Sequence, residues 1–126
     1  MKLPAILLLS ALPAAAAAAG DPVAGDPGRG AAVYERCQAC HSLTRNRTGP
    51  KHCGLIGRAA GGVAGFAYSK ALKESGIVWD AESLDRFLEN PFKAVPGTRM
   101  GYAGVKDPQE RADLIAFLAA AGACEE

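Results

Sequence analysis

The segment Cys37-Gln-Ala-Cys-His41 constrains this chain more than any other part of the sequence. It brings two thiols and one imidazole together within a few residues. Three kinds of chemistry use such a set: a structural metal site, thiol–disulfide exchange, and covalent attachment of a haem whose iron the histidine binds. The spacing alone is compatible with all three, so the remaining sequence has to distinguish them.

The first residues have the pattern of a secretory signal peptide. Lys2 precedes an apolar run from Leu3 to Leu12, and an alanine tract then ends at Ala19. A membrane-spanning helix needs about 20 apolar residues, which makes an uncleaved anchor the weaker alternative. We therefore expect a signal peptide at 1–19, removed near Ala19, and a single domain at 20–126 in the oxidising periplasm.

The charge balance and the apolar composition limit what this domain can be. The chain has 14 lysines and arginines against 13 acidic residues, which argues against a general nucleic-acid binder. Much of the apolar content is alanine, so a core of large side chains would be thin. Small domains with thin cores usually need a metal, a disulfide or a cofactor for stability.

Helix start and stop signals predict four helices joined by long loops. Asp26-Pro27 and Asp107-Pro108 each place a capping aspartate before a proline at the first helical position, and no segment alternates like a strand. We therefore predict an all-α fold with few helices and much loop. The expected helices cover 27–40, 69–75, 80–90 and 107–121, and the expected loops cover 42–65 and 92–106.

Covalent haem attachment accounts for the motif better than the two alternatives do. A zinc site needs four ligands, and the adjacent residues His52 and Cys53 are poorly placed to bind one ion together. A thioredoxin-like cysteine pair begins a helix in a β-rich domain, whereas this pair ends a predicted helix. One covalent haem c would use both thiols and His41, and it would supply the missing apolar core.

His41 then needs a partner on the other face of the iron. Met100 lies in a predicted loop, where a methionine is a plausible thioether ligand, although a core position is equally compatible with the residues. His52 follows His41 too closely to reach the opposite face easily, and we expect it to be a packed or surface histidine. An open site is the third alternative.

The order of several segments resembles the class I cytochromes c, the small monohaem cytochromes of mitochondria and proteobacteria. The resemblance covers about residues 30–122. Besides CQACH, the matching segments are TGP, GLIGRAAG, GFAYSKAL, GIVW, LDRFLENP, PGTRMGYAG and ERADLIAFL.

The resemblance implies a role for each matching residue. His41 and Met100 would be the axial iron ligands, and Cys37 and Cys40 the thioether donors. The carbonyl of Pro50 would accept the other ring N–H of His41. The haem propionates would be bound by Arg58, Tyr68 and Trp79, with Thr98 nearby. On the first and last helices, Gly30 and Tyr34 would pack against Leu114 and Phe117.

The chain departs from the family pattern at several positions. Phe87 stands where mitochondrial relatives have a tyrosine that bonds near the methionine sulfur, and His52 replaces a commonly apolar residue near the haem. The other departures are Leu72, Tyr102 and Phe92. In the family's fold the regions of Cys53 and Cys124 lie near each other, which implies a disulfide between them; two free thiols are the alternative.

The resemblance implies a one-electron carrier rather than an enzyme, because both axial positions of the iron would be filled. It would shuttle electrons between a membrane cytochrome bc complex and a terminal oxidase, a reaction centre or a periplasmic enzyme. We expect a monomer without stable membrane insertion. A peroxidase or ligand sensor with a labile Met100, or a haem subunit of an oxidoreductase, is the alternative. The expected docking residues are Arg36, Arg47, Lys93, Arg99 and Lys106, which could also be ordinary solvated charges.

Overall fold

The computed structural model describes Met1 and residues 23–125, so the predicted signal peptide, apart from Met1, lies outside the described residues. The described part is helical, and its only extended pairing is one isolated bridge between Ala59 and Val78. The predicted all-α class is therefore confirmed. Along the chain the helices are α1 (Pro27–Tyr34), the 3-10 turn η1 (Glu35–Cys37), α2 (Lys70–Lys73), α3 (Ala81–Glu89), α4 (Pro91–Ala94) and α5 (Pro108–Ala120).

The helices begin where side chains cap them. The side chains of Asp26 and Asp107 accept the backbone N–H groups of Arg29 and Glu110, as the sequence predicts. At α3 the side chain of Asp80 accepts the N–H of Ser83, and Ser83 accepts the N–H of Asp80 in return. This reciprocal cap fixes the first turn of α3.

The structure differs most from the predicted helices in the first helix and after the third. The first helix does not continue regularly to Cys40: α1 ends at Tyr34, and the carbonyl of Cys37 accepts the N–H groups of both Cys40 and His41. Helix ends commonly tighten in this way. The third helix ends before Pro91, as predicted, but Asn90 then caps a further short helix, α4, which begins with this proline and lies where a loop is predicted.

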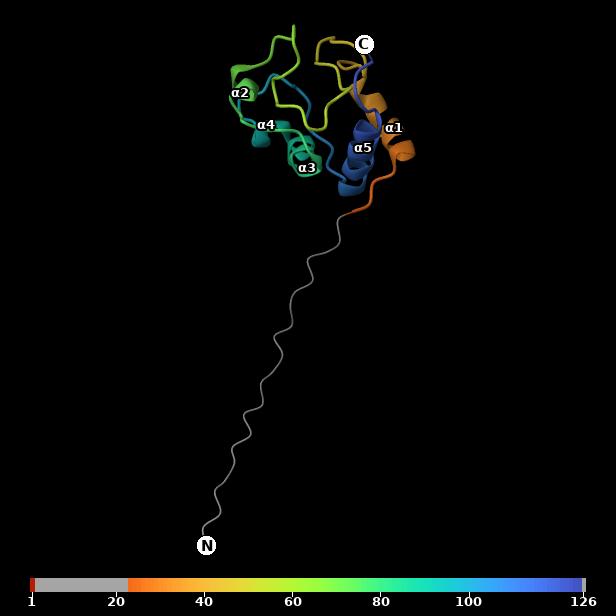
Figure 1. The fold of residues 1–126 in the computed structure, drawn as a ribbon, viewed down its shortest axis with the longest axis vertical. Coiled ribbons are helices and arrows are strands. Elements are labelled where there is room, and N and C mark those ends of the chain that lie inside the picture. The colour runs from red at the N-terminus through yellow and green to blue at the C-terminus, as the bar shows by residue number, and fades with distance from the viewer. Residues whose placement is uncertain (2–22, 126) are drawn as a thin grey trace.

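Helices α1 and α5 pack against each other along one side of the molecule (Figure 1). At Gly30 an added Cβ would lie 2.0 Å from the carbonyl oxygen of Asp113, so only glycine permits this approach. One turn later, the rings of Tyr34 and Phe117 lie 5.0 Å apart. The predicted packing of the first helix on the last is confirmed at these positions.

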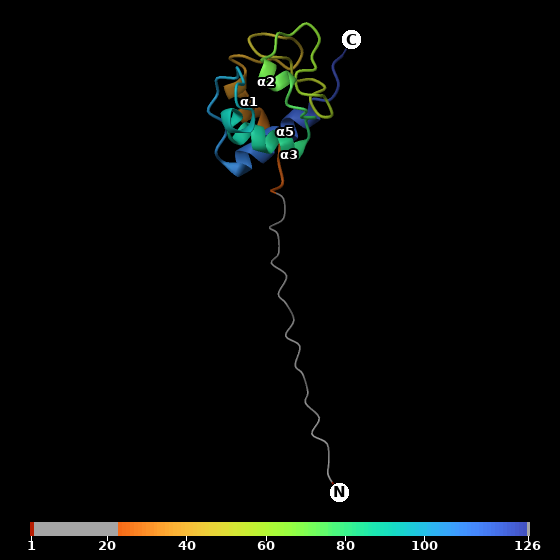
Figure 2. The same ribbon diagram turned by 90° about the vertical axis from the view of Figure 1, so that its left-hand side faces the viewer.

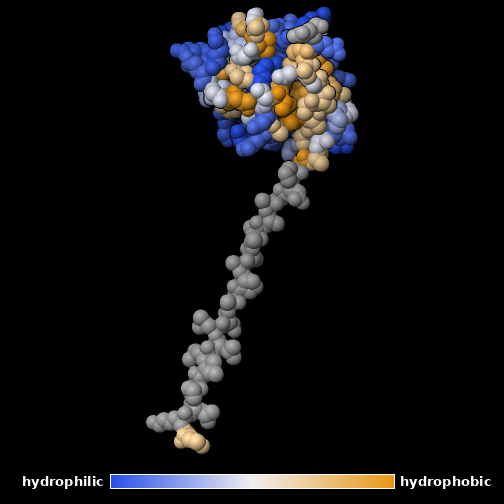
Figure 3. All heavy atoms as spheres, in the orientation of Figure 1, coloured by the Kyte–Doolittle hydropathy of each residue, from blue (hydrophilic) through white to orange (hydrophobic). Residues whose placement is uncertain are grey.

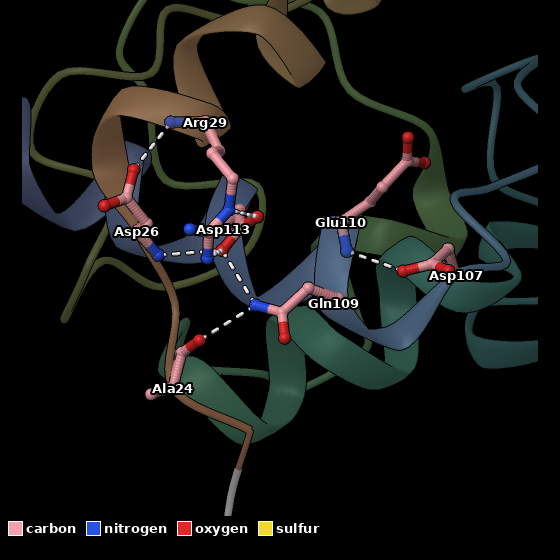
Figure 4. A network of polar contacts seen from close by, with 7 residues as sticks. All are labelled: Ala24, Asp26, Arg29, Asp107, Gln109, Glu110 and Asp113. Carbon is pink, nitrogen blue, oxygen red and sulfur yellow. Dashed lines mark hydrogen bonds and ion pairs between the residues drawn. The ribbon is translucent and has the colours of Figure 1, made fainter.

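A polar network joins the start of α1 to α5 (Figure 4). The buried carboxylate of Asp113 accepts hydrogen bonds from the Arg29 guanidinium, the Gln109 amide and the backbone N–H of Asp26. Gln109 also donates to the carbonyl of Ala24. The network therefore holds the chain from Ala24 onward against the last helix.

Helices α2, α3 and α4 lie on the other side of the molecule in Figure 1, the side that faces the viewer in Figure 2, and the long loops run over both sides. The C-terminal tail lies beside the loop that follows Pro50. There Gly54 donates its N–H to the carbonyl of Gly122, and Cys53 and Cys124 form a disulfide with an S–S distance of 2.04 Å. The end of the chain is thus tied to this loop.

The exposed surface is mainly polar, with an apolar area over the side formed by α1 and α5 (Figure 3). Exposed alanines lie on both helices, at Ala31, Ala32, Ala119 and Ala120. Across residues 23–125, no helix is both long enough and apolar enough to cross a bilayer.

Candidate functional site

A cavity of about 530 Å³ lies between the helices and the loops. Cavities of a few hundred cubic ångströms hold small-molecule ligands and cofactors. All four predicted haem and iron ligands, Cys37, Cys40, His41 and Met100, line it. Its wall also includes a group of apolar residues: Leu55, Leu72, Trp79, Leu84, Phe87, Leu88, Leu114 and Leu118.

The two motif cysteines do not form a disulfide with each other; Cys37 is partly buried and Cys40 is exposed. Burial raises the pKa of the Cys37 thiol, and the neighbouring Arg36 only partly opposes this. A raised pKa is the opposite of what a thiol-exchange nucleophile needs. Within residues 23–125 there is also no cluster of three or more His, Cys, Asp or Glu residues suited to a metal ion. Thiol exchange and zinc binding therefore both fit this site poorly.

His41 is buried in the cavity wall, with an exposed fraction of 8%. Its Nδ1 atom lies 2.8 Å from the carbonyl oxygen of Pro50. Burial lowers the pKa of His41, although the bond to Pro50 acts in the opposite direction. A neutral ring that donates Nδ1–H to this carbonyl keeps its Nε2 lone pair for a metal.

Gly49 is a site residue whose role the sequence did not reveal beyond its place in the TGP segment. An added Cβ there would lie 2.3 Å from Cε1 of His41. Only a glycine lets the loop backbone approach the imidazole so closely. One feature of the sequence could have indicated this role: Gly49 directly precedes Pro50, whose carbonyl is hydrogen-bonded to His41.

His52 lies against His41 rather than across the cavity from it. The two imidazole rings are stacked, with centroids 4.1 Å apart and planes inclined by 20°. Nδ1 of His52 lies 3.1 Å from the hydroxyl oxygen of Tyr34. The expectation of a packed histidine was correct, but its contact with His41 could not be seen in the sequence.

Arg58 is held at the cavity with one of its donors unused. Its two terminal nitrogens donate to the carbonyls of Cys53 and Lys51, at 3.0 and 2.9 Å. Its Nε is buried and has no partner among the described residues, and burial lowers the Arg58 pKa. A buried N–H without an acceptor is costly, so this atom fits an anionic group such as a haem propionate.

The other predicted propionate contacts also line the cavity. The Tyr68 hydroxyl accepts the backbone N–H of Val63 at 3.1 Å, which leaves its own proton available. Trp79 is buried against Phe87, with ring centroids 5.1 Å apart. The Thr98 hydroxyl accepts the N–H of Met100 at 3.3 Å. The donors, the apolar wall and the paired thiols together fit a haem.

The five predicted docking residues are not all at the cavity. Arg36 and Arg99 line it; Arg36 pairs with Glu110 at 2.7 Å, and Arg99 donates to the carbonyl of Tyr68 at 3.0 Å. Arg47, Lys93 and Lys106 are exposed residues outside the cavity wall. Lys106 donates to the carbonyl of Glu89 at 2.6 Å, and Arg47 to that of Gln38.

Comparison with known proteins supports the same assignment. The family described as Cytochrome c matches residues 28–121. The chain is 48% identical over 99 residues to cytochrome c2 of Rhodomicrobium vannielii, covering 76% of this chain and 79% of that protein. It is 50% identical over 97 residues to cytochrome c of Euglena viridis, covering 75% and 95% of the two chains.

A solved structure, cytochrome cH from Methylobacterium extorquens, has the same fold. It superposes with a TM-score of 0.75 at 42% identity, covering 76% of this chain and 99% of that chain. The match spans most of the chain and includes the cysteine motif and the cavity that it lines. The protein therefore belongs to the cytochrome c family and is a monohaem electron carrier with one covalently bound haem c.

Proposed function

We propose that the protein is an exported, periplasmic one-electron shuttle in which His41 and Met100 bind the haem iron from its two faces. The observation that carries this proposal is that both residues line the cavity that Cys37 and Cys40 also line. The haem iron supplies the chemistry, since it accepts one electron and later releases it. The protein's residues hold the haem, exclude water and set the potential.

His41 is suited to one axial position because its Nδ1 is occupied by the Pro50 carbonyl. A hydrogen bond of this kind fixes the tautomer and raises the basicity of the ligating nitrogen. Met100 is partly buried, and its backbone is bonded to the Thr98 hydroxyl. A thioether ligand favours the ferrous state and so raises the reduction potential.

The apolar wall around the site supports electron transfer over catalysis. Phe87 takes part in that wall and is buried, with an exposed fraction of 7%. Two filled axial positions leave no place for a substrate on the iron, which is why we propose a carrier and not an enzyme.

The ligation is tested by the near-infrared band that sulfur bound to ferric haem produces. The oxidised protein should show this band across neutral pH, and Met100→Ala should remove it while the haem stays covalently attached. Arg99→Ala, one residue away, is the matched control and should keep the band. If the unmodified protein lacks the band, Met100 is not bound, and a peroxidase or ligand-sensing role replaces the carrier proposal.

The proposed docking onto redox partner proteins is based on the five predicted basic residues. Arg36 and Arg99, which line the cavity, and the exposed residues Arg47, Lys93 and Lys106 would steer the protein onto acidic faces of a cytochrome bc complex and of an oxidase, a reaction centre or a periplasmic enzyme. Electrostatic steering acts mainly on association rates and weakens with salt.

Stopped-flow reduction by a purified cytochrome bc complex measures this steering. Arg36→Glu and Arg99→Glu, at the two predicted docking residues that line the cavity, should slow the reaction and flatten its salt dependence. The control is Arg86→Glu, an exposed cation on α3 that does not line the haem cavity, and it should leave both unchanged. Equal effects of all three variants would contradict a defined docking face. Cell fractionation and N-terminal sequencing of the mature protein test export and cleavage near Ala19.

A further inference from the structure

His52 is a polar side chain in direct contact with the histidine of the motif. Its ring stacks on that of His41, with centroids 4.1 Å apart and an interplanar angle of 20°. A hydrogen bond tolerates a range of angles, so the Pro50 carbonyl by itself leaves the plane of His41 some freedom to tilt. The stacked ring of His52 restricts that freedom, because a tilt of the His41 ring would push it into the face of the His52 ring.

The backbone holds His52 in place relative to the motif. Its N–H donates to the carbonyl of Ser42 at 3.0 Å, and the next N–H, that of Cys53, donates to Leu43 at 2.8 Å. Ser42 directly follows His41. Two successive hydrogen bonds therefore set the His52 backbone beside the segment that carries His41, and only the side-chain direction remains to be fixed.

Tyr34 fixes that direction. Its hydroxyl oxygen lies 3.1 Å from Nδ1 of His52, and the two rings meet edge to face with centroids 5.7 Å apart. Tyr34 itself is 2% exposed and packs on Phe117 of α5. A side chain held between two helices is a rigid anchor, since moving it would open the core.

The geometry gives one consistent direction for this hydrogen bond. Burial raises the pKa of Tyr34 to about 12, so its hydroxyl keeps its proton at neutral pH. A phenolic O–H can donate to an unprotonated ring nitrogen, and Nδ1 of His52 lies 3.1 Å away. The Tyr34 hydroxyl therefore donates to Nδ1 of His52, which places the ring proton of His52 on Nε2.

We propose that His52 and Tyr34 form a unit that positions the imidazole of His41 and so sets the plane of the axial ligand on the iron. They are positioning residues, because they act through His41. The inference rests on the proposed ligation by His41. It gives a role to His52, a histidine that the proposed ligation of the iron does not use.

The experiment separates the stacked ring from the hydrogen bond. His52→Phe keeps a ring but removes the acceptor, whereas His52→Asn keeps a polar group near the position of Nδ1 but removes the ring. Tyr34→Phe removes only the hydroxyl. The control is Tyr102→Phe, which deletes a hydroxyl in the same cavity, whereas the side-chain partners of His52 and His41 are Tyr34 and Pro50.

The readout is the set of haem-methyl hyperfine shifts in the ferric protein, whose order and spread report the axial ligand plane. His52→Asn should change the pattern most. His52→Phe and Tyr34→Phe should each give a smaller change, and combining them should add nothing to His52→Phe alone. Tyr102→Phe should keep the unmodified order.

Unfolding by guanidinium chloride distinguishes positioning from simple packing. An unchanged methyl pattern in His52→Phe and His52→Asn, with only a lower unfolding midpoint, would overturn the proposal. Additive changes from Tyr34→Phe and His52→Phe would overturn the claim that the two act as a unit. Failure of the ligation itself would appear earlier, as the lack of a low-spin ferric spectrum in the unmodified protein.

Discussion

Arg29 holds the buried carboxylate of Asp113 with two of its nitrogens, Nε at 2.8 Å from Oδ2 and a terminal nitrogen at 2.9 Å from Oδ1. The pair joins the first turn of α1 to the middle of α5 (Figure 4). The Asp113 side chain is only 4% exposed, whereas that of Arg29 is 60% exposed. The carboxylate is thus enclosed by donors that all favour its charged form.

The first prediction concerns the loss of folding stability at acidic pH. The hydrogen bond from Arg29, followed by those from the Asp26 N–H and Gln109, holds the pKa of Asp113 well below its usual range despite burial. A carboxylate whose pKa is lower in the folded than in the unfolded protein makes its full contribution to the free energy of unfolding above the unfolded-state pKa of about 3.9. This contribution is lost as the pH falls toward the folded-state pKa. Asp113→Asn should therefore lower the denaturation midpoint at pH 7, and its difference from the unmodified protein should shrink below about pH 4.

The matched control for this prediction is Glu82→Gln. Glu82 pairs with Arg86 four residues on along the exposed face of α3. Exposed pairs of this kind contribute about 0.3–0.5 kcal/mol, so this variant should behave like the unmodified protein at every pH. A loss of stability in Asp113→Asn that stays constant down to pH 2 would contradict the assignment.

The second prediction concerns the close approach of α1 and α5. Gly30→Ala would place a Cβ 2.0 Å from the Asp113 carbonyl oxygen and 2.7 Å from Cβ of Phe117. Overpacking of this kind costs about 1–3 kcal/mol and sometimes more, and here backbone atoms must move. Gly28→Ala, on the same helix but exposed, has its nearest contact at 3.1 Å from the Asp26 side chain. Guanidinium unfolding should show a large loss for the first variant and a much smaller effect for the second.

The third prediction concerns the disulfide between Cys53 and Cys124, which are separated by 71 residues in sequence. On the chain-entropy model a crosslink of that length stabilises by up to about 4 kcal/mol. The double variant Cys53→Ala/Cys124→Ala should therefore unfold at a lower guanidinium concentration but keep the haem spectrum. A thiol-blocking reagent should react with Cys53 and Cys124 of the unmodified protein only after reduction, which verifies that the disulfide is formed. If the two proteins then have equal unfolding midpoints, the disulfide does not stabilise the fold as predicted.

The fourth prediction concerns the unused donor of Arg58. We expect the buried Nε of Arg58 to bind a haem propionate, which places a cation beside the haem. A nearby cation disfavours the ferric state, which carries one more positive charge than the ferrous state, and Arg58→Gln removes this effect. The reduction potential should then fall by some tens of millivolts in a redox titration. Arg45→Gln, an exposed loop residue, is the control and should leave the potential unchanged. An unaltered potential in both variants would place Arg58 outside the electrostatic environment of the haem.

Much of the architecture could be predicted from local sequence signals. Asp26-Pro27, Asp80 and Asp107-Pro108 begin helices because a carboxylate cap and a proline act on the nearest backbone groups. The predicted helix at 27–40 was too long, and α4 was missed. In both places the outcome depends on competition between turn types that differ little in energy.

The sequence alone determined the cofactor and the class of protein. Covalent haem attachment requires a fixed local spacing of cysteines and histidine, and the order of the family segments indicated the class. The contacts around His41 were decided only by the tertiary structure. Gly49, His52 and Tyr34 meet the imidazole through the folding of loops and of α1 onto α5. Such contacts depend on where separate segments cross in space, and no local pattern of residues encodes that crossing.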